Sequence, residues 1–177
     1  MTPWGLSTDI PVTADYDGDG KADIAIWRPS NGTWYISKST GGNLITAWGS
    51  GLAPYNDIPV VADYDGDGKA DMAIWRPVDS SYTNFGVFYV LKSSTGFNPI
   101  PSGYVVTPWG IGNAPYNDIP VPADYDGDGK ADRAVWRKLD GGWYILKSSN
   151  GSVQATIWGS NALGDVPNPK DFDGDGK

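Results

Sequence analysis

The sequence predicts an all-β protein assembled from tandem four-stranded antiparallel units. One motif of acidic residues and glycines recurs three times, each time in the same order relative to its neighbours. Short segments rich in β-branched and aromatic residues follow each copy, and turns of glycine, proline and asparagine separate these segments. No stretch shows the periodicity of an amphipathic helix. Units of about 40–50 residues that contain four strands have the size and strand content of β-propeller blades.

The units cover residues 9–49, 57–110 and 118–159 of a single repeat domain that spans residues 1–177. Partial units stand before and after them, at residues 1–5 and 165–177. The first partial unit, Thr2-Pro3-Trp4-Gly5, matches the end of the second full unit, Thr107-Pro108-Trp109-Gly110. The sequence therefore predicts three full blades with partial strands at both ends.

Each unit has the same order of elements, as the first unit illustrates. The segment Asp9–Val12 enters the unit, the acidic loop occupies residues 15–23, and an alternating apolar strand ends at Trp27-Arg28. A turn leads to the aromatic strand Trp34-Tyr35-Ile36, and a last strand ends at Trp48-Gly49. The second unit is longer because residues 78–87 and 97–104 are inserted in its hairpin loops.

The acidic loop is a predicted calcium site, because calcium takes six to eight oxygen ligands that a loop can supply at alternating positions. Counted from Asp15 as position 1, carboxylates stand at positions 1, 3, 5 and 9, and the lysine at position 7 can offer only its backbone carbonyl. Gly18 and Gly20 permit the sharp turn. The predicted ligands of the three full sites are Asp15, Asp17, Asp19, Lys21 and Asp23; Asp63, Asp65, Asp67, Lys69 and Asp71; and Asp124, Asp126, Asp128, Lys130 and Asp132. Asp171, Asp173 and Asp175 begin an incomplete fourth site.

Other interpretations of the loop fit less well. An EF-hand places a glutamate at position 12, whereas position 12 is Ile26, the loop leads into a strand and the chain contains no glutamate. A plain Asp-Gly hairpin turn is common, but it needs one or two carboxylates, and four packed together repel one another. Magnesium demands strict octahedral geometry and tends to keep its waters. The pattern therefore favours Ca²⁺.

Composition limits the classes of partner and chemistry. The net charge of −8 and the pI of about 4.3 argue against nucleic acid or an anionic membrane as a partner. The chain has no cysteine for disulfides and no histidine to act as a general base. No apolar run has transmembrane length, and no signal peptide is visible. Because weak calcium sites fill only at extracellular calcium concentrations, we expect a secreted or cell-surface protein.

The motif D-x-D-G-D-G-K-x-D, followed by an A-x-W-R strand, resembles the FG-GAP/VCBS family of calcium-binding β-propeller repeats. These repeats also occur in integrin α-subunit heads and some fungal lectins. The resemblance covers essentially the whole chain. It implies that the loop joins the first and second strands of each blade and holds Ca²⁺ through the residues given above. It also implies extracellular adhesion or ligand binding, frequently of glycans, and usually no catalysis.

The number of units departs from the family pattern. Closed propellers have four to eight blades, whereas this sequence contains three full ones. A lone three-blade chain would leave unpaired strand edges. Two alternatives stay open: the chain is a fragment of a longer array, or it is a subunit that completes itself with further copies in a ring or a filament.

Aromatic and arginine side chains are candidates for ligand contact. The nine tryptophans all stand at repeat positions, in W-R, W-Y and W-G pairs, so we expect them to pack in the core and between blades. We expect the arginines after each loop, Arg28, Arg76 and Arg137, to form structural ion pairs or to stack on tryptophan. The insertions contain aromatic residues that do not recur in the other units. Loops on a rigid scaffold often contain the residues that bind a ligand. The predicted ligand residues are therefore Tyr82, Phe85, Phe97 and Tyr104.

Catalysis would need carboxylates that do not bind the metal, or a nucleophile with a base. Outside the loops the chain has only Asp9, Asp57, Asp118, Asp165, Asp79 and Asp140, and the first four recur with the repeat. The sequence predicts a non-catalytic extracellular calcium-binding repeat protein that recognises a glycan or a surface protein. The alternative is a structural subunit that assembles with itself, end to end, into a filament or fibre. A polysaccharide-active enzyme is a distant third hypothesis.

Overall fold

A computed structural model gives the structure of this chain and describes residues 4–82, 85–100 and 102–174. In this part of the chain the strands form three four-stranded antiparallel sheets, each in sequence order. The predicted all-β class and blade-like units are thereby confirmed. None of the helices in the described residues is long and apolar enough to cross a membrane.

Each sheet is one blade. Blade 1 contains β1 (Ile10–Pro11), β2 (Ile24–Arg28), β3 (Thr33–Ser37) and β4 (Asn43–Ala47). Blade 2 contains β5 (Ile58–Pro59), β6 (Met72–Arg76), β7 (Val87–Leu91) and β8 (Tyr104–Pro108). Blade 3 contains β9 (Ile119–Pro120), β10 (Arg133–Arg137), β11 (Gly142–Leu146) and β12 (Val153–Ile157). Two short 3₁₀ helices, η1 (Ser93–Thr95) and η2 (Asn161–Leu163), follow β7 and β12.

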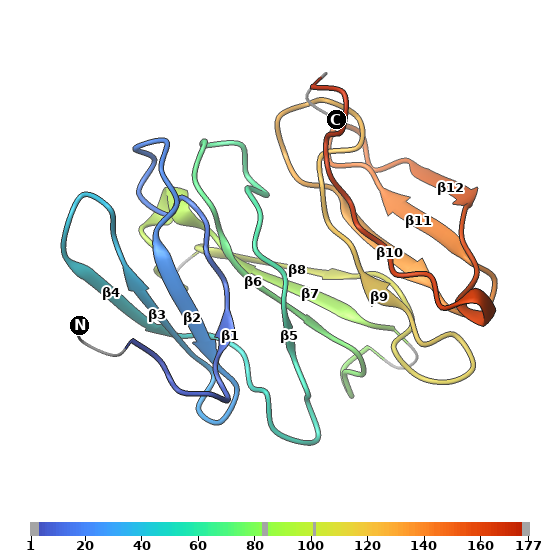
Figure 1. Ribbon diagram of the computed structural model, residues 1–177, viewed down its shortest axis with the longest axis horizontal. Helices are drawn as coiled ribbons and strands as arrows, with labels where there is room; N and C mark the ends of the chain where they lie inside the picture. The colour runs from blue at the N-terminus through green and yellow to red at the C-terminus, as the bar shows by residue number, and fades with distance from the viewer. Residues whose placement is uncertain (1–3, 83–84, 101, 175–177) are drawn as a thin grey trace.

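The blades stand side by side in chain order and do not close into a ring. Figure 1 shows blade 2 between blade 1 and blade 3, with the two chain ends on opposite sides of the molecule. In each blade the acidic loop joins the first strand to the second, as the family resemblance implies. An isolated bridge, Ala14 to Asp23 in blade 1, closes the base of the loop, and the same bridge recurs in blades 2 and 3.

The core lies between the blades because both faces of each central strand are apolar. Alternate residues of a strand point to opposite faces of its sheet, and β6 shows this division. Met72 and Ile74 pack with the buried cluster of blade 1, whereas Ala73 and Trp75 pack with Val135 of blade 3. Blade 2 is therefore covered on both sides by its neighbours.

The predicted packing role of the tryptophans is confirmed for those inside the array. Four of them, Trp27, Trp34, Trp75 and Trp136, are at most 1% exposed. Trp48 and Trp109 end the outer strands, and their indole N–H groups reach the next blade. Trp48 Nε1 donates to the Tyr89 carbonyl at 3.1 Å, and Trp109 Nε1 donates to the Tyr144 carbonyl at 3.1 Å.

An arginine–aspartate pair ties the entry of each blade to its second strand. Arg76 donates from Nε and Nη2 to the two carboxylate oxygens of Asp57, at 2.7 and 2.9 Å. The Asp57 side chain is fully buried and also accepts the backbone N–H of Ser50 at 2.7 Å. The same bidentate pair forms between Arg28 and Asp9 and between Arg137 and Asp118.

The arginines stack on tyrosine, not on tryptophan. The Arg76 guanidinium lies over the rings of Tyr55 and Tyr89, at 4.1 and 4.9 Å from their centroids. Arg28 lies over Tyr35 in the same way, at 4.6 Å. Of the two predicted roles, the structural ion pair is the one that forms, and the ring faces turned towards the arginines belong to tyrosines.

Replacing Trp109 by alanine should lower the free energy of unfolding by about 2 kcal/mol, because it removes packing and one hydrogen bond between blades. Trp158→Ala is the matched control, since Trp158 ends the corresponding strand of blade 3 and is 77% exposed. That control should change stability by less than about 0.5 kcal/mol. Denaturant unfolding measures both variants, and equal losses would contradict the interblade role.

Replacing Arg76 by methionine should destabilise the protein by about 3 kcal/mol, because the buried Asp57 carboxylate would lose its partner. Adding Asp57→Asn should recover part of this loss, since the amide carries no charge. Chemical denaturation of the single and double variants gives the comparison. A loss of unfolding free energy below about 1 kcal/mol in Arg76→Met would show that the ion pair contributes little to stability.

Candidate metal centres

The backbone of each acidic loop is wrapped around the aspartate at position 1. Asp15 accepts the backbone N–H of Gly18 at 2.6 Å and that of Gly20 at 2.8 Å. Both glycines have positive φ angles, 83° and 81°, which residues with a side chain rarely adopt. Asp63 and Asp124 accept the corresponding bonds at the same distances. The three loops therefore share one conformation.

The aspartate at position 9 is buried and links the loop to the rest of its blade. Asp23 is fully buried and accepts the backbone N–H of Tyr16 at 2.9 Å and that of Ser39 at 2.7 Å. Ser39 belongs to the turn between β3 and β4, so one carboxylate joins the loop to that turn. Asp71 and Asp132 do the same in blades 2 and 3.

Hydroxyl groups from the turn between the third and fourth strands complete the surroundings of the carboxylates. Ser39 Oγ donates to Asp19 at 2.6 Å, and the hydroxyl of Thr40 donates to Asp17. Equivalent hydroxyl pairs serve the other loops: Ser93 and Ser94 in blade 2, and Ser148 and Ser149 in blade 3. Sequence reasoning missed these residues, although their recurrence directly after a lysine in each unit was a usable signal.

Carboxylate oxygens converge in each loop closely enough to share one cation. Oxygens of three aspartates lie within 4.8 Å of one another in every full loop. These are Asp15, Asp17 and Asp19; Asp63, Asp65 and Asp71; and Asp124, Asp126 and Asp132. Among the described residues, the structure brings together twelve of the predicted aspartates in three equivalent sites, of which these nine approach most closely.

One buried oxygen in each loop has no hydrogen-bond partner, and this atom tests whether a metal fits. It is Oδ1 of the position-3 aspartate: Asp17, Asp65 and Asp126. A buried carboxylate oxygen without a donor or a cation is unfavourable by several kcal/mol. Because the same atom is unpaired in three equivalent loops, the feature belongs to the loop design. One hard cation in each loop would satisfy that oxygen. The residues present therefore fit a metal that binds through oxygen.

The surroundings shift the pKa values of these carboxyl groups in both directions. Burial raises the pKa of Asp71 to about 6, against the hydrogen bonds that Ser93 and Tyr64 donate to it. Hydrogen bonds from the loop backbone, first that of Gly18, lower the pKa of Asp15. The hydroxyl of Ser39 lowers the pKa of Asp19 in the same way. The lowered pKa values of Asp15 and Asp19 keep these two groups ionised, whereas the raised pKa of the buried Asp71 calls for a nearby positive charge.

The lysines and the fourth loop complete the predicted set. Lys21 is exposed, and its Nζ lies 3.4 Å from Asp19, so its side chain points outwards, as expected if only its carbonyl faced a metal. In the fourth loop Gly174 donates its backbone N–H to Asp171 at 2.7 Å, the same bond that opens the full loops. Asp173 is exposed, and Asp175 lies outside the described residues.

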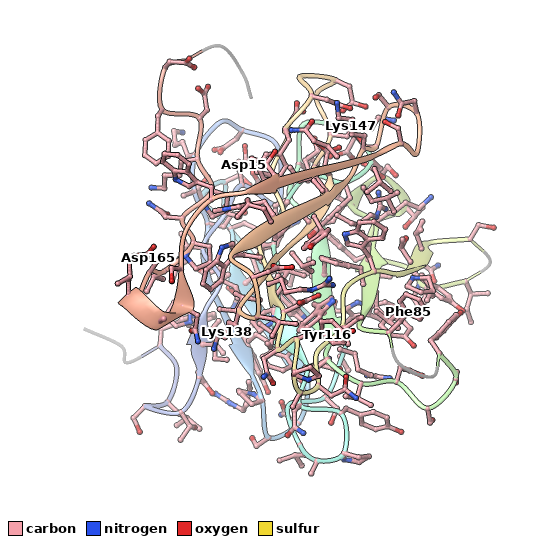
Figure 2. The ribbon with its side chains drawn as sticks, turned by 90° about the vertical axis from the view of Figure 1, so that its right-hand side faces the viewer. Asp15, Phe85, Tyr116, Lys138, Lys147 and Asp165 are labelled. Atoms are coloured by element: carbon pink, nitrogen blue, oxygen red, sulfur yellow. The ribbon has the colours of Figure 1, made fainter. Side chains whose placement is uncertain are left out.

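The four predicted ligand aromatics do not form one surface. Tyr82 and Phe85 share a turn between β6 and β7 and are 36% and 48% exposed. Phe97 has a positive φ angle of 58° and packs against Tyr16 of blade 1, with ring centroids 6.4 Å apart. Tyr104 begins β8, at the other end of the blade from the β6–β7 turn. Figure 2 shows Phe85 towards the lower side of the molecule and Asp15 towards its upper side.

Tyr104 is the predicted ligand residue that lines a groove. Its ring lies 5.6 Å from that of Trp48, across the boundary between blades 1 and 2. The groove has a volume of about 340 Å³. Its lining consists of Trp48, Gly49, Ile74, Arg76, Tyr89 and Tyr104. The rings of Trp48 and Tyr104 therefore form a partly exposed wall of the groove at the boundary between blades 1 and 2.

The comparison with protein families agrees with the loop geometry. The family model described as FG-GAP-like repeat matches residues 15–74, from the first acidic loop into β6 of blade 2. No curated protein and no solved structure matches the chain. The matched segment contains the first two acidic loops, which have the same hydrogen bonds as the third. Residues 15–74 thus match an FG-GAP-like repeat, as the resemblance of the loop motif indicated, and the third loop shares their hydrogen bonds.

Proposed function

We propose that this protein is a non-catalytic, extracellular recognition module whose blades are stabilised by calcium. The observation that carries the proposal is the buried, unpartnered carboxylate oxygen that recurs in three equivalent acidic loops. It makes a cation a structural component of each blade. FG-GAP-type repeats commonly serve adhesion or recognition, usually without catalysis, and they typically occur outside the cell; the family match supports these parts of the proposal.

Calcium suits the donor set better than other metals do. The converging atoms are all oxygens, and the chain has neither histidine nor cysteine to attract a softer metal. Loops with several carboxylates and a backbone carbonyl can meet the six to eight oxygens that calcium takes at 2.3–2.6 Å. When bound, the ion would supply positive charge to the loop and join its carboxylates to one centre. The position-9 aspartate would carry this rigidity to the β3–β4 turn.

The carboxylates outside the loops support a non-catalytic role, because the blade structure uses them. Asp79 accepts bonds from Arg76 at 3.0 Å and from the Tyr89 hydroxyl at 2.7 Å. Asp140 accepts the Tyr144 hydroxyl at 2.8 Å. The entry aspartates pair with arginines, as described above. In the described residues, these acids therefore stabilise turns and strands and do not line an open cleft as a pair.

The groove beside Tyr104 is the ligand site that we propose. Aromatic faces at its wall offer an apolar surface for one side of a sugar ring, while the Tyr104 hydroxyl and the neighbouring backbone offer polar contacts. Arg76 lies at the groove, but its guanidinium is hydrogen-bonded to Asp57 and Asp79. Its role is therefore to form part of the groove wall, and not to bind the ligand directly. Among the described residues, the corresponding outer-strand position of blade 3 is Val153, and it presents no aromatic ring.

Self-assembly end to end has less support, because each end of the array carries residues in places that a further blade would supply. Gly5 lies against Ile26 as Gly49 lies against Ile74, so Gly5 has the position beside blade 1 that Gly49 has beside blade 2. At the other end, Asp165 accepts the Ser160 N–H at 2.9 Å, as the entry aspartates of the full blades accept theirs. A second copy would have to displace one of these segments. Association between copies stays a prediction.

Adding calcium to the metal-free protein should raise its melting temperature. A ligand at 100 times its Kd stabilises the folded state by about 2.7 kcal/mol per site. Asp65→Asn, which changes one ligand in one loop, should remove about one third of the calcium-dependent increase. Differential scanning calorimetry in chelator, Ca²⁺ and Mg²⁺ at equal ionic strength measures this. Identical melting temperatures in chelator and in calcium would sink the metal proposal.

Tyr104→Ala should abolish the binding of glycans on a mixed array, or weaken it at least tenfold, without changing the fold. Tyr82→Ala is the matched control, because Tyr82 is an aromatic of the other insertion and lies outside the groove. Titration of the bound glycan against both variants gives the ratio. Loss of binding in Tyr82→Ala but not in Tyr104→Ala would move the ligand site to the β6–β7 turn.

A further inference from the structure

The three acidic loops contact one another in chain order, the first with the second and the second with the third. The backbone N–H of Ala70, in the second loop, donates to the carbonyl of Asp15, in the first loop, at 2.7 Å. The backbone N–H of Ala131, in the third loop, donates to the carbonyl of Asp63, in the second, at 2.7 Å. Asp15 and Asp63 are the position-1 aspartates around which their own loops wrap. Each loop is therefore held partly by its neighbour.

A lysine side chain strengthens the same contact. The stem of Lys69 lies across Gly18 of the preceding loop, so closely that a Cβ added to Gly18 would stand 2.9 Å from Lys69 Cε. Lys130 lies across Gly66 in the same way, also at 2.9 Å. Glycine is therefore required at position 4 for two reasons: its φ angle is positive, and the lysine of the next loop leaves no room for a side chain. The lysine at position 7 thus belongs to two loops.

One peptide group connects the two sites chemically. The peptide between Lys69 and Ala70 carries the Lys69 carbonyl, a predicted ligand of the second loop, and the Ala70 N–H, which holds Asp15 of the first loop. A peptide group is planar, so orienting its carbonyl also orients its N–H. Withdrawing electron density through the carbonyl oxygen makes the N–H a better donor, as in other hydrogen-bonded chains. The peptide between Lys130 and Ala131 has the same position between the second and third loops.

We propose that calcium binding is positively coupled between adjacent blades, and that the Lys69–Ala70 and Lys130–Ala131 peptides transmit the coupling. The proposal rests on the calcium function proposed above. Binding at one loop fixes the peptide that supports the position-1 ligand of the preceding loop, and that loop then binds calcium with less reorganisation. Coupling in binding is reciprocal, so each loop also gains from occupation of the one before it. Only neighbours share a peptide, so the first and third loops are coupled weakly.

The first loop provides an internal control. Lys21 and Ala22 have the sequence positions of Lys69 and Ala70, but both are exposed, and among the described residues Ala22 donates no equivalent bond. A substitution at Lys21 therefore removes the same side chain from the same loop position without touching a neighbouring site. The difference between Lys69 and Lys21 variants isolates the contact between loops.

Calcium titration of the full chain, followed by the amide signals of Gly18, Gly66 and Gly127 in NMR spectra, reports on each loop separately. Asp126→Asn inactivates the third loop, and Asp128→Asn in the same loop is a second inactivating variant. The affinity of the second loop should then fall about fivefold, while that of the first changes less than twofold. Spectra without calcium verify that the remaining blades are folded in each variant.

Lys69→Ala should weaken calcium binding at the first loop by about threefold and reduce its dependence on the second, because Gly18 loses its cover. Lys21→Ala should leave the affinities of the second and third loops within twofold of the original, and any change at the first loop reports the loss of its own contact between Lys21 and Asp19. If every loop binds calcium but each keeps its affinity when its neighbour is inactivated, the coupling is disproved and the calcium sites stand. If the glycine signals do not respond to calcium, the calcium proposal fails, and the coupling fails with it.

Discussion

Repulsion between clustered carboxylates is the constraint on which this structure depends. Each loop gathers four aspartates within nine residues, and the backbone N–H groups of the loop and the hydroxyls of the β3–β4 turn satisfy most of their oxygens. One buried oxygen per loop is left over. Because the loop touches its own hairpin turn and the next blade, compensation of this charge decides the positions of three elements at once. A cation held in the loop would therefore stabilise the array and not only the loop.

The other aspartates meet the same requirement with arginine in place of a metal. Asp57 is a buried residue that precedes the loop, and it is neutralised by Arg76, the last residue of the strand that follows the loop. The two residues of the pair flank the loop, so a salt bridge fixes the two ends of the loop, and the carboxylates in its middle are the ones that a cation could neutralise. Tyr89 and Tyr55 cover the guanidinium, which limits its solvation and favours its bond to Asp57. Most aspartates of the chain thus have a structural place, either in an acidic loop or in an ion pair with arginine.

The sequence was sufficient for features that depend on local spacing. The period of the repeat located the strands, and alternation of aspartate and glycine located the loops, because both patterns follow from neighbouring residues. Contacts between distant residues were less predictable. Ser39 meets Asp19 across twenty positions, and nothing in a serine-rich turn shows which carboxylate it faces. Phe97 was placed with the ligand residues because its insertion is irregular, yet its ring fills space beside Tyr16 at a blade boundary. For Arg76 the sequence left an ion pair or stacking on tryptophan open; the ion pair forms with Asp57, and the faces over the guanidinium are those of Tyr55 and Tyr89, because adjacent strand residues such as Trp75 and Arg76 point to opposite faces.

Repetition separates what the fold requires from what is available for recognition. Residues that recur in every blade, such as Trp75, Arg76 and the loop aspartates, are held by contacts that recur with them. Changing one of them would disturb a packing unit. The second blade departs from the pattern at its insertions, and Tyr104 is the last residue of one of them, at a position where blade 3 has Val153. Tyr104 is nearly half exposed and uses its ring to extend the wall that Trp48 begins. A side chain with this freedom lies beside a blade boundary that ion pairs and the contacts between the acidic loops hold in place. It can acquire a ligand without loss of the fold, and for this reason we expect recognition at the irregular blade.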